Sequence, residues 1–194
     1  MLSIIQYPHP TLRHKAKSLR RVDAELQSIV REMFELMYKA KGVGLAATQV
    51  DLPYRLFVAN LSSDPGHPEE EQVFLNPVIS KPRGLETAEE GCLSLPGLYG
   101  DVKRPERVTI DAYNLSGEHI QGEVSGLLAR VIQHETDHLD GVLFIDRISP
   151  TGRLVVKHIL EEFEINFEGR RERGELPDDA ANLARLQELE KQRC

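Results

Sequence analysis

The sequence predicts an α+β fold in which strands surround one buried helix and a helical tail follows. Three observations predict this class. An amphipathic helix pattern lies near the start, three β-rich segments occupy the middle, and a second, more apolar helix pattern is centred near residue 132. We expect one main domain over residues 1–150 and a C-terminal helical extension over residues 151–194.

The N-terminal third should hold an arm and then a helix. Residues 7–13 contain two prolines, which favour extended or turning backbone. Asp23 is a good helix cap, and Gly42 is expected to end the helix as a residue that tolerates positive φ. Apolar residues recur at helical spacing between them: Leu26, Ile29, Val30, Met33, Phe34 and Met37.

The middle of the chain predicts strands over residues 55–61, 73–79 and 106–115, because these segments are rich in β-branched and aromatic residues. The acidic residues 62–72, which include proline and glycine, should form an exposed loop.

A second helix is predicted between Ser125 and Gly141. It is apolar enough to be buried, through Leu127, Leu128, Val131, Ile132 and Leu139. Beyond Pro150 we expect a short helix over residues 154–163, a basic hinge over 169–175, and a polar helix over 179–192.

Composition excludes several classes of protein. Net charge is −7, aromatic residues are 6%, and there is no Trp, so direct DNA binding is not expected. No apolar run is long enough to span a bilayer, and the N-terminus does not have the pattern of a secretory signal or transit peptide. Two cysteines give no disulfide framework, so a reducing, cytoplasmic setting is expected.

The segment QHETDHLDG places His134 and His138 four positions apart on the second helix. Both project from one face, and that face points toward the core. Two buried imidazoles would be costly alone, whereas a divalent metal satisfies both. Glu135 lies about 100° around the helix from His134 and is placed for proton transfer rather than ligation. The alternative is a structural histidine pair.

Two residues are candidates for a third ligand. His158 is the only histidine after the pair, and it lies beyond a Pro-Gly break. Cys92, in the segment EEGCLSLPG, is the better candidate, because Gly91, Pro96 and Gly97 favour a tight backbone that presents the thiol. A lone cysteine is more often a small buried apolar residue, and that alternative stays open. Asp137 and Asp140 are expected near solvent or bonded to a histidine nitrogen.

The glycine-rich segment GVGLAATQV, residues 42–50, looks like a loop that enters a strand. It lacks the Lys and Ser/Thr of a phosphate loop. Gln49 offers an amide donor that can stabilise a developing oxyanion. The glycines have a simpler reading, namely that they end the preceding helix.

Together, the segments GVGLAATQV, EGCLSLPG and QHETDHLDG resemble, in this order and spacing, the three signature motifs of the peptide deformylases. The YPHPTLR segment also looks like the entry segment of that family, and the resemblance covers roughly residues 1–150. It implies antiparallel sheets packed around the central motif helix. It also implies hydrolytic removal of the formyl group from N-formylmethionine at the start of nascent polypeptides, with release of formate.

Carried over by position, the resemblance implies that Cys92, His134 and His138 hold one divalent metal ion. Fe(II) is the expected ion in the cell, and Zn(II) or Ni(II) are alternatives. It further implies that Glu135 is the general acid/base. Gln49 and the backbone amide of Leu93 would bind the formyl oxygen, and Gly44 would let the substrate backbone approach.

The resemblance also implies a transient contact with the ribosome. The arginines of the basic hinge, Arg170, Arg171 and Arg173, are better candidates for this than the last helix, where acidic and basic residues mix. The alternative is a solvated linker.

Two rival functions remain at this point. A zinc endopeptidase would share the helical motif and would take its third ligand after His138. A binding protein would keep the fold without turnover, although every expected polar group is present.

Overall fold

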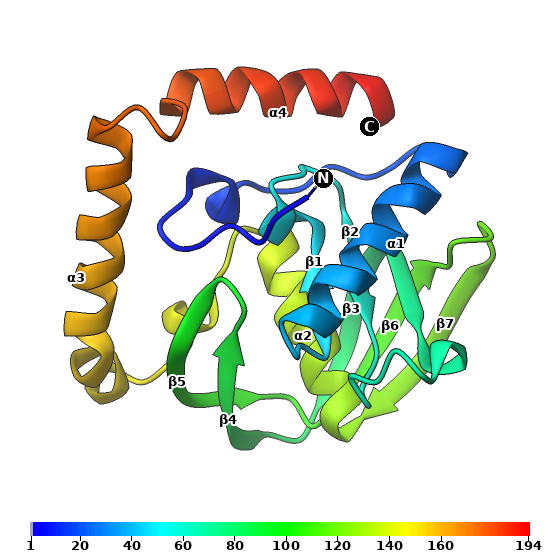
Figure 1. Ribbon diagram of the computed structural model, residues 1–194. Coiled ribbons are helices and arrows are strands. Elements are labelled where there is room, and N and C mark those ends of the chain that lie inside the picture. The colour runs from blue at the N-terminus through cyan, green and yellow to red at the C-terminus, as the bar shows by residue number, and fades with distance from the viewer. Residues whose placement is uncertain (1) are drawn as a thin grey trace.

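The computed structural model describes residues 2–194 and has an α+β architecture built on antiparallel strands (Figure 1). Five strands form one sheet in the order β1-β2-β3-β6-β7, and β4 and β5 form a separate hairpin. The strands are β1 (Gly44–Ala46), β2 (Leu56–Ala59), β3 (Gln72–Arg83), β4 (Glu86–Cys92), β5 (Leu95–Arg104), β6 (Arg107–Tyr113) and β7 (His119–Ser125). The predicted fold class is confirmed.

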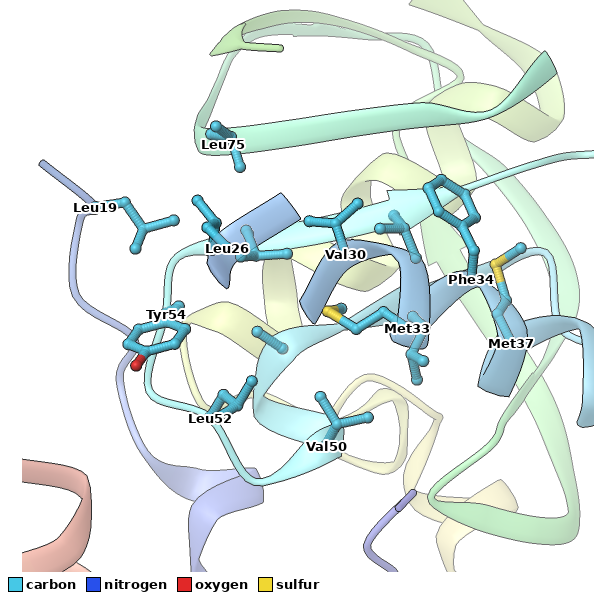
Figure 2. Packing of buried hydrophobic residues seen from close by; sticks show 14 residues of the cluster. Leu19, Leu26, Val30, Met33, Phe34, Met37, Val50, Leu52, Tyr54 and Leu75 are labelled. Atoms are coloured by element: carbon cyan, nitrogen blue, oxygen red, sulfur yellow. The ribbon is translucent and has the colours of Figure 1, made fainter. Parts of the chain in front are cut away.

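Helix α1 (Ala24–Lys39) begins where the sequence predicted, because the Asp23 side chain accepts a hydrogen bond from the Leu26 amide at 2.9 Å. Its apolar face packs on β1, β2 and the segment after β1, and Leu26, Met33 and Met37 are fully buried there (Figure 2). This cluster fixes the segment of residues 42–50 against the sheet.

The end of α1 differs from the prediction. Lys41, not Gly42, has the positive φ of 56° that reverses the chain. Gly42 lies close to another part of the site, since a Cβ there would lie 2.7 Å from Cδ1 of Leu93. A side chain at residue 42 would therefore displace the Leu93 side chain.

Helix α2 (Gly126–Leu139) is the central helix, and it packs against β1, β2, β3, β6 and β7. Ser125 is its N-cap residue as predicted, but the serine side chain makes no capping hydrogen bond. Every residue from Val131 to Leu139 is buried. Leu127 was expected to be buried and is instead 55% exposed, because it lines an open cleft. Gly141 has φ 74°, and the Arg13 carbonyl lies where its Cβ would be.

Three strands were not predicted, namely β4, β5 and β7. The segment around Cys92 forms the β4–β5 hairpin, and β7 lies at one edge of the five-stranded sheet. The glycine-rich segment does enter a strand, β1, and then continues into a short 3-10 helix, η2 (Ala47–Val50), which carries Gln49.

Two helices form the C-terminal segment. Helix α3 (Pro150–Glu172) is much longer than the predicted short helix, and it absorbs most of the expected hinge, so the chain turns only at residues 173–178. Helix α4 (Asp179–Arg193) returns across the N-terminal arm (Figure 1). Within the described residues, no helix combines the length and apolar character needed to cross a membrane.

Candidate active site

A cleft of about 650 Å³ opens between the β4–β5 hairpin, helix α2 and the segment that follows α1. Its walls mix apolar and polar groups, as is typical of small-molecule sites. The lining includes Gly44, Gln49, Cys92, Leu127, His134 and Glu135. All three sequence motifs thus meet at one cleft, although they lie up to about 90 residues apart in the chain.

The potential ligand atoms of Cys92, His134 and His138 lie within 4.8 Å of one another. Cys92 Sγ is 3.2 Å from Nε2 of His138, and the two imidazole centroids are 5.0 Å apart. A tetrahedral centre with ordinary metal–sulfur and metal–nitrogen bonds separates its ligand atoms by roughly 3.3–3.6 Å. The observed spacing is close to this. His158 lies exposed on α3, away from the cleft.

Glu90 orients the first histidine, a role that the sequence analysis missed. Its Oε2 atom lies 3.0 Å from Nδ1 of His134, which leaves Nε2 of that ring facing Cys92 and His138. Glu90 is buried, and the Arg104 guanidinium binds both of its oxygens at 2.7 and 2.9 Å. Burial disfavours the charged form, but the hydrogen bonds from His134 and Arg104 hold the pKa of Glu90 well below its usual range.

The buried ion pairs continue outward from Glu90. Arg104 also donates to Asp137 at 2.6 Å, and Arg147 pairs with the same carboxylate. Arg130 donates to Glu90 at 2.7 Å and thereby ties helix α2 to the hairpin. The expectation for Asp137 was wrong: it is buried and bonds arginines, not a histidine.

The other flanking carboxylate, Asp140, is exposed, as expected. It pairs with Arg55 at 2.7 Å.

Glu135 is 4% exposed and points toward β1. A Cβ on Gly44 would lie 2.5 Å from Oε1 of Glu135, so a larger residue there would displace the Glu135 carboxylate. Oε2 of Glu135 has no hydrogen-bond partner among the described residues and can therefore accept a proton. Burial raises the pKa of Glu135 to about 7, against the opposing effects of His134 and Arg104.

Gln49 is 1% exposed, and its amide is held at both ends. Oε1 accepts from the Ala46 backbone at 2.8 Å, so Nε2 faces Cys92 Sγ at 3.4 Å and Ser94 Oγ at 3.3 Å. Leu93, which directly follows Cys92, also lines the cleft. The Gln49 NH₂ group is thus a donor beside the group of potential ligands.

The electrostatics of the cleft fit a cation. Burial lowers the pKa of His138 well below its usual value, so this imidazole is neutral, the form that binds metal. Burial has the same tendency at His134, but hydrogen bonds to Cys92 and Glu90 raise the pKa of His134 to about 10. The negative charge around His134 that holds a proton on this ring also favours a divalent cation bound by sulfur and nitrogen ligands.

The family model described as polypeptide deformylase matches residues 1–154. The chain belongs to the peptide deformylase family. Peptide deformylases are metal-dependent hydrolases, and this one removes the N-terminal formyl group from the N-formylmethionine of nascent polypeptides. The function that the resemblance implied is therefore confirmed, and the endopeptidase and binding-protein alternatives are set aside.

Individual peptide deformylases are similar to this chain over most of their length. The peptide deformylase of Rhodopirellula baltica is 51% identical over 181 residues, covering 92% of this chain and 89% of the relative. That of Neisseria meningitidis is 46% identical, covering 81% and 93%. The solved structure of Arabidopsis thaliana peptide deformylase 1B, in complex with an inhibitor, has a TM-score of 0.83 at 42% identity, covering 92% and 97%.

Proposed function

We propose that the deformylase site of this chain consists of Cys92, His134 and His138 as metal ligands and Glu135 as general acid/base. The observation that carries the proposal is the convergence of three potential ligand atoms within 4.8 Å, next to a buried carboxylate that has an unpartnered oxygen. When bound, a divalent ion supplies Lewis acidity and makes coordinated water a nucleophile at neutral pH.

The protein groups account for orientation and proton transfer. Gln49 Nε2 and the Leu93 N–H donate to the formyl oxygen as negative charge builds on it. Glu135 accepts a proton from the attacking water and later delivers it to the amine that leaves. Gly44 keeps the backbone of β1 close to Glu135, and it leaves room for the substrate backbone beside that strand.

The ion in the cell is proposed to be Fe(II), with Zn(II) or Ni(II) as alternatives, because a Cys/His/His set accepts all three. Purification under anaerobic conditions followed by elemental analysis tests this. Recovery of zinc alone, with full activity, would contradict the iron assignment. We also propose a cytoplasmic location, which agrees with the reduced state expected for Cys92.

A transient ribosome contact is a weaker part of the proposal. Arg170 and Arg173 both pair with Glu175, and Arg171 pairs with Asp179, so the former hinge offers little free positive charge to RNA. Cosedimentation with ribosomes at low salt tests it, and a protein that stays in the supernatant would remove this contact.

The direct test of the function is formate release from formyl-Met-Ala by the metal-loaded protein, with unformylated casein as the control substrate. We expect rapid formate release and intact casein. Cleavage of casein without formate would support the endopeptidase instead.

Glu135→Ala is expected to bind metal with unchanged stoichiometry and to lose turnover, because two proton transfers depend on this carboxylate. Metal analysis and formate release on the same sample measure both properties. Near-full deformylation by this variant would remove Glu135 from the mechanism.

Cys92→Ala is expected to abolish stoichiometric metal binding, because two imidazoles remain as the only ligands from the cleft. Cys194→Ala is the matched control, since that cysteine lies at the chain end and donates to the Lys17 carbonyl. Unchanged metal content in Cys92→Ala would refute the ligand assignment.

A further inference from the structure

The start of the N-terminal arm, residues 2–9, is bonded to two segments of the active site. The Ile5 amide donates to the Gln49 carbonyl on η2, and the Tyr7 amide donates to the Ser94 carbonyl in the turn after β4, each at 2.9 Å. Gln49 and Ser94 are both buried. Ile5 and Tyr7 are not among the residues that line the active cleft, so the arm contacts these segments from outside it.

The two carbonyls belong to residues whose side chains also meet. Gln49 Nε2 lies 3.3 Å from Ser94 Oγ. Ile5, Gln49, Ser94 and Tyr7 therefore form a closed ring of contacts. In this ring the arm joins η2 to the turn of the β4–β5 hairpin on the far side of the Gln49 amide.

The backbone of Gln49 depends on the arm for its hydrogen bond. Asp51 and Leu52, which follow η2, donate to Thr48 and Ala47 instead. Within the described residues, the partner of the Gln49 carbonyl is thus the Ile5 amide. A shift of about 1 Å in a positioning group can cost up to about 10² in rate, so this bond matters to a donor that must meet one oxygen atom.

The arm is itself anchored on helix α3. The Tyr7 hydroxyl donates to Glu164 Oε1 at 2.6 Å, and the His9 ring meets the Phe167 ring edge-on with centroids 6.0 Å apart. Burial raises the pKa of Tyr7 to about 12, and Glu164 adds to this effect, so the hydroxyl keeps its proton and stays a donor at neutral pH. Residues of the C-terminal extension thus fix the arm that holds η2.

We propose that Ile5 is a positioning residue for deformylation, whose amide holds η2 where the Gln49 side chain meets the formyl oxygen. The Tyr7–Glu164 pair fixes the arm for this purpose. This role rests on the proposed function of Gln49 as an oxyanion donor. Loss of the Ile5 bond should lower kcat with little change in KM, because the contact that it supports is strongest in the transition state.

Ile5→Pro removes the amide hydrogen and tests this role in a double-mutant cycle with Gln49→Leu. In the metal-loaded, full-length protein we expect Ile5→Pro to lower kcat about ten-fold, with KM and metal content unchanged to within about two-fold. In the Gln49→Leu background the same change should alter kcat by less than about two-fold, because the group that the arm positions is already absent.

The cycle separates this proposal from the proposed function. A further ten-fold loss in the Gln49→Leu background would mean that Ile5 supports the cleft in general, and it would overturn the positioning role. Full kcat in Gln49→Leu alone would remove Gln49 from the mechanism, and with it the role of Ile5.

Ile4→Pro is the matched control, because it makes the same change one residue earlier. The Ile4 amide has no hydrogen-bond partner among residues 2–194, so kcat should stay within about two-fold of the original. Equal kcat in Ile4→Pro and Ile5→Pro would overturn the proposal. Circular dichroism verifies that each variant is folded.

Glu164 tests the same connection without a change to the backbone. Glu164 is exposed, and Glu164→Ala, which leaves the Tyr7 hydroxyl without its acceptor, should lower kcat about three-fold. Glu164→Gln keeps an acceptor oxygen and should restore the original kcat. Unchanged kcat in Glu164→Ala, or an equal loss in Glu164→Gln, would refute the anchoring of the arm by this pair.

Discussion

Gln49 illustrates how single residues in this deformylase are fixed by their neighbours. The Ala46 amide holds one end of its side-chain amide, which leaves the NH₂ group directed at the thiol of Cys92. The identity of Gln49 as a polar group in a glycine-rich segment was visible in the sequence. Its orientation was not, because it depends on a short 3-10 helix that places residues 46 and 49 together.

Gln49→Leu is expected to lower kcat about 10²- to 10³-fold with little change in metal content, because one of two oxyanion donors is lost. Formate-release kinetics and elemental analysis measure the two effects. Ser94→Ala is the control: it removes the other contact of Nε2 but keeps the amide, so kcat should fall by less than about ten-fold. An equal loss in both variants would mean that Gln49 acts through packing.

At the scale of elements, the site depends on how the β4–β5 hairpin is joined to helix α2. The hairpin supplies Cys92 and the helix supplies both histidines, while Glu90, Arg104 and Arg130 connect the two elements through buried ion pairs. Arg104 is 2% exposed, so removal of Glu90 would leave a buried guanidinium with Asp137 as its remaining carboxylate partner.

Glu90→Gln is expected to weaken metal binding about 10- to 100-fold, because the His134 ring loses its anionic partner. Competition with a chelator under anaerobic conditions measures the affinity. Glu89→Gln makes the same chemical change one residue earlier, on the exposed side of β4, and should leave the metal affinity unchanged. If both variants bound metal as tightly as the original chain, Glu90 would have no role in positioning His134.

Helix α2 and its histidine pair were predictable because periodicity is a local property of the sequence. The hairpin was not, because β4 and β5 are stabilised by each other and neither has a strong apolar pattern alone. One signal was overlooked: residues two apart in a strand share a face, so Glu90 lies on the same side as Cys92. The glycines and proline near Cys92 indicated a tight turn, but they did not show which residues of the two strands pair with each other.

At the scale of the whole molecule, α4 packs against the N-terminal part of the chain and holds it in place. Asn182 donates to Thr11 Oγ1 at 3.0 Å, and Arg193 binds both oxygens of Asp23 at 2.8 and 2.9 Å. The division at residue 150 remains a proposal, since α4 is in close contact with the N-terminal arm. The sequence predicted a polar helix over residues 179–192 but did not show which part of the molecule this helix contacts.

Leu186→Ala is expected to lower the free energy of unfolding by about 2 to 4 kcal/mol, because Leu186 is 2% exposed and truncation leaves a cavity. Denaturant titration of the metal-loaded protein measures it. Leu183→Ala, at an exposed position on the same helix, should change the free energy by no more than about 0.5 kcal/mol. Equal effects would show that α4 does not brace the domain.

The hydrogen bond from the Arg20 amide to the Arg193 carbonyl joins the N-terminal arm to the last turn of α4. The arm that it supports also donates from Ile5 to the Gln49 carbonyl, at the edge of the cleft. Loosening of α4 would therefore reach Gln49 through the arm, although no residue of α4 is among those that line the cleft.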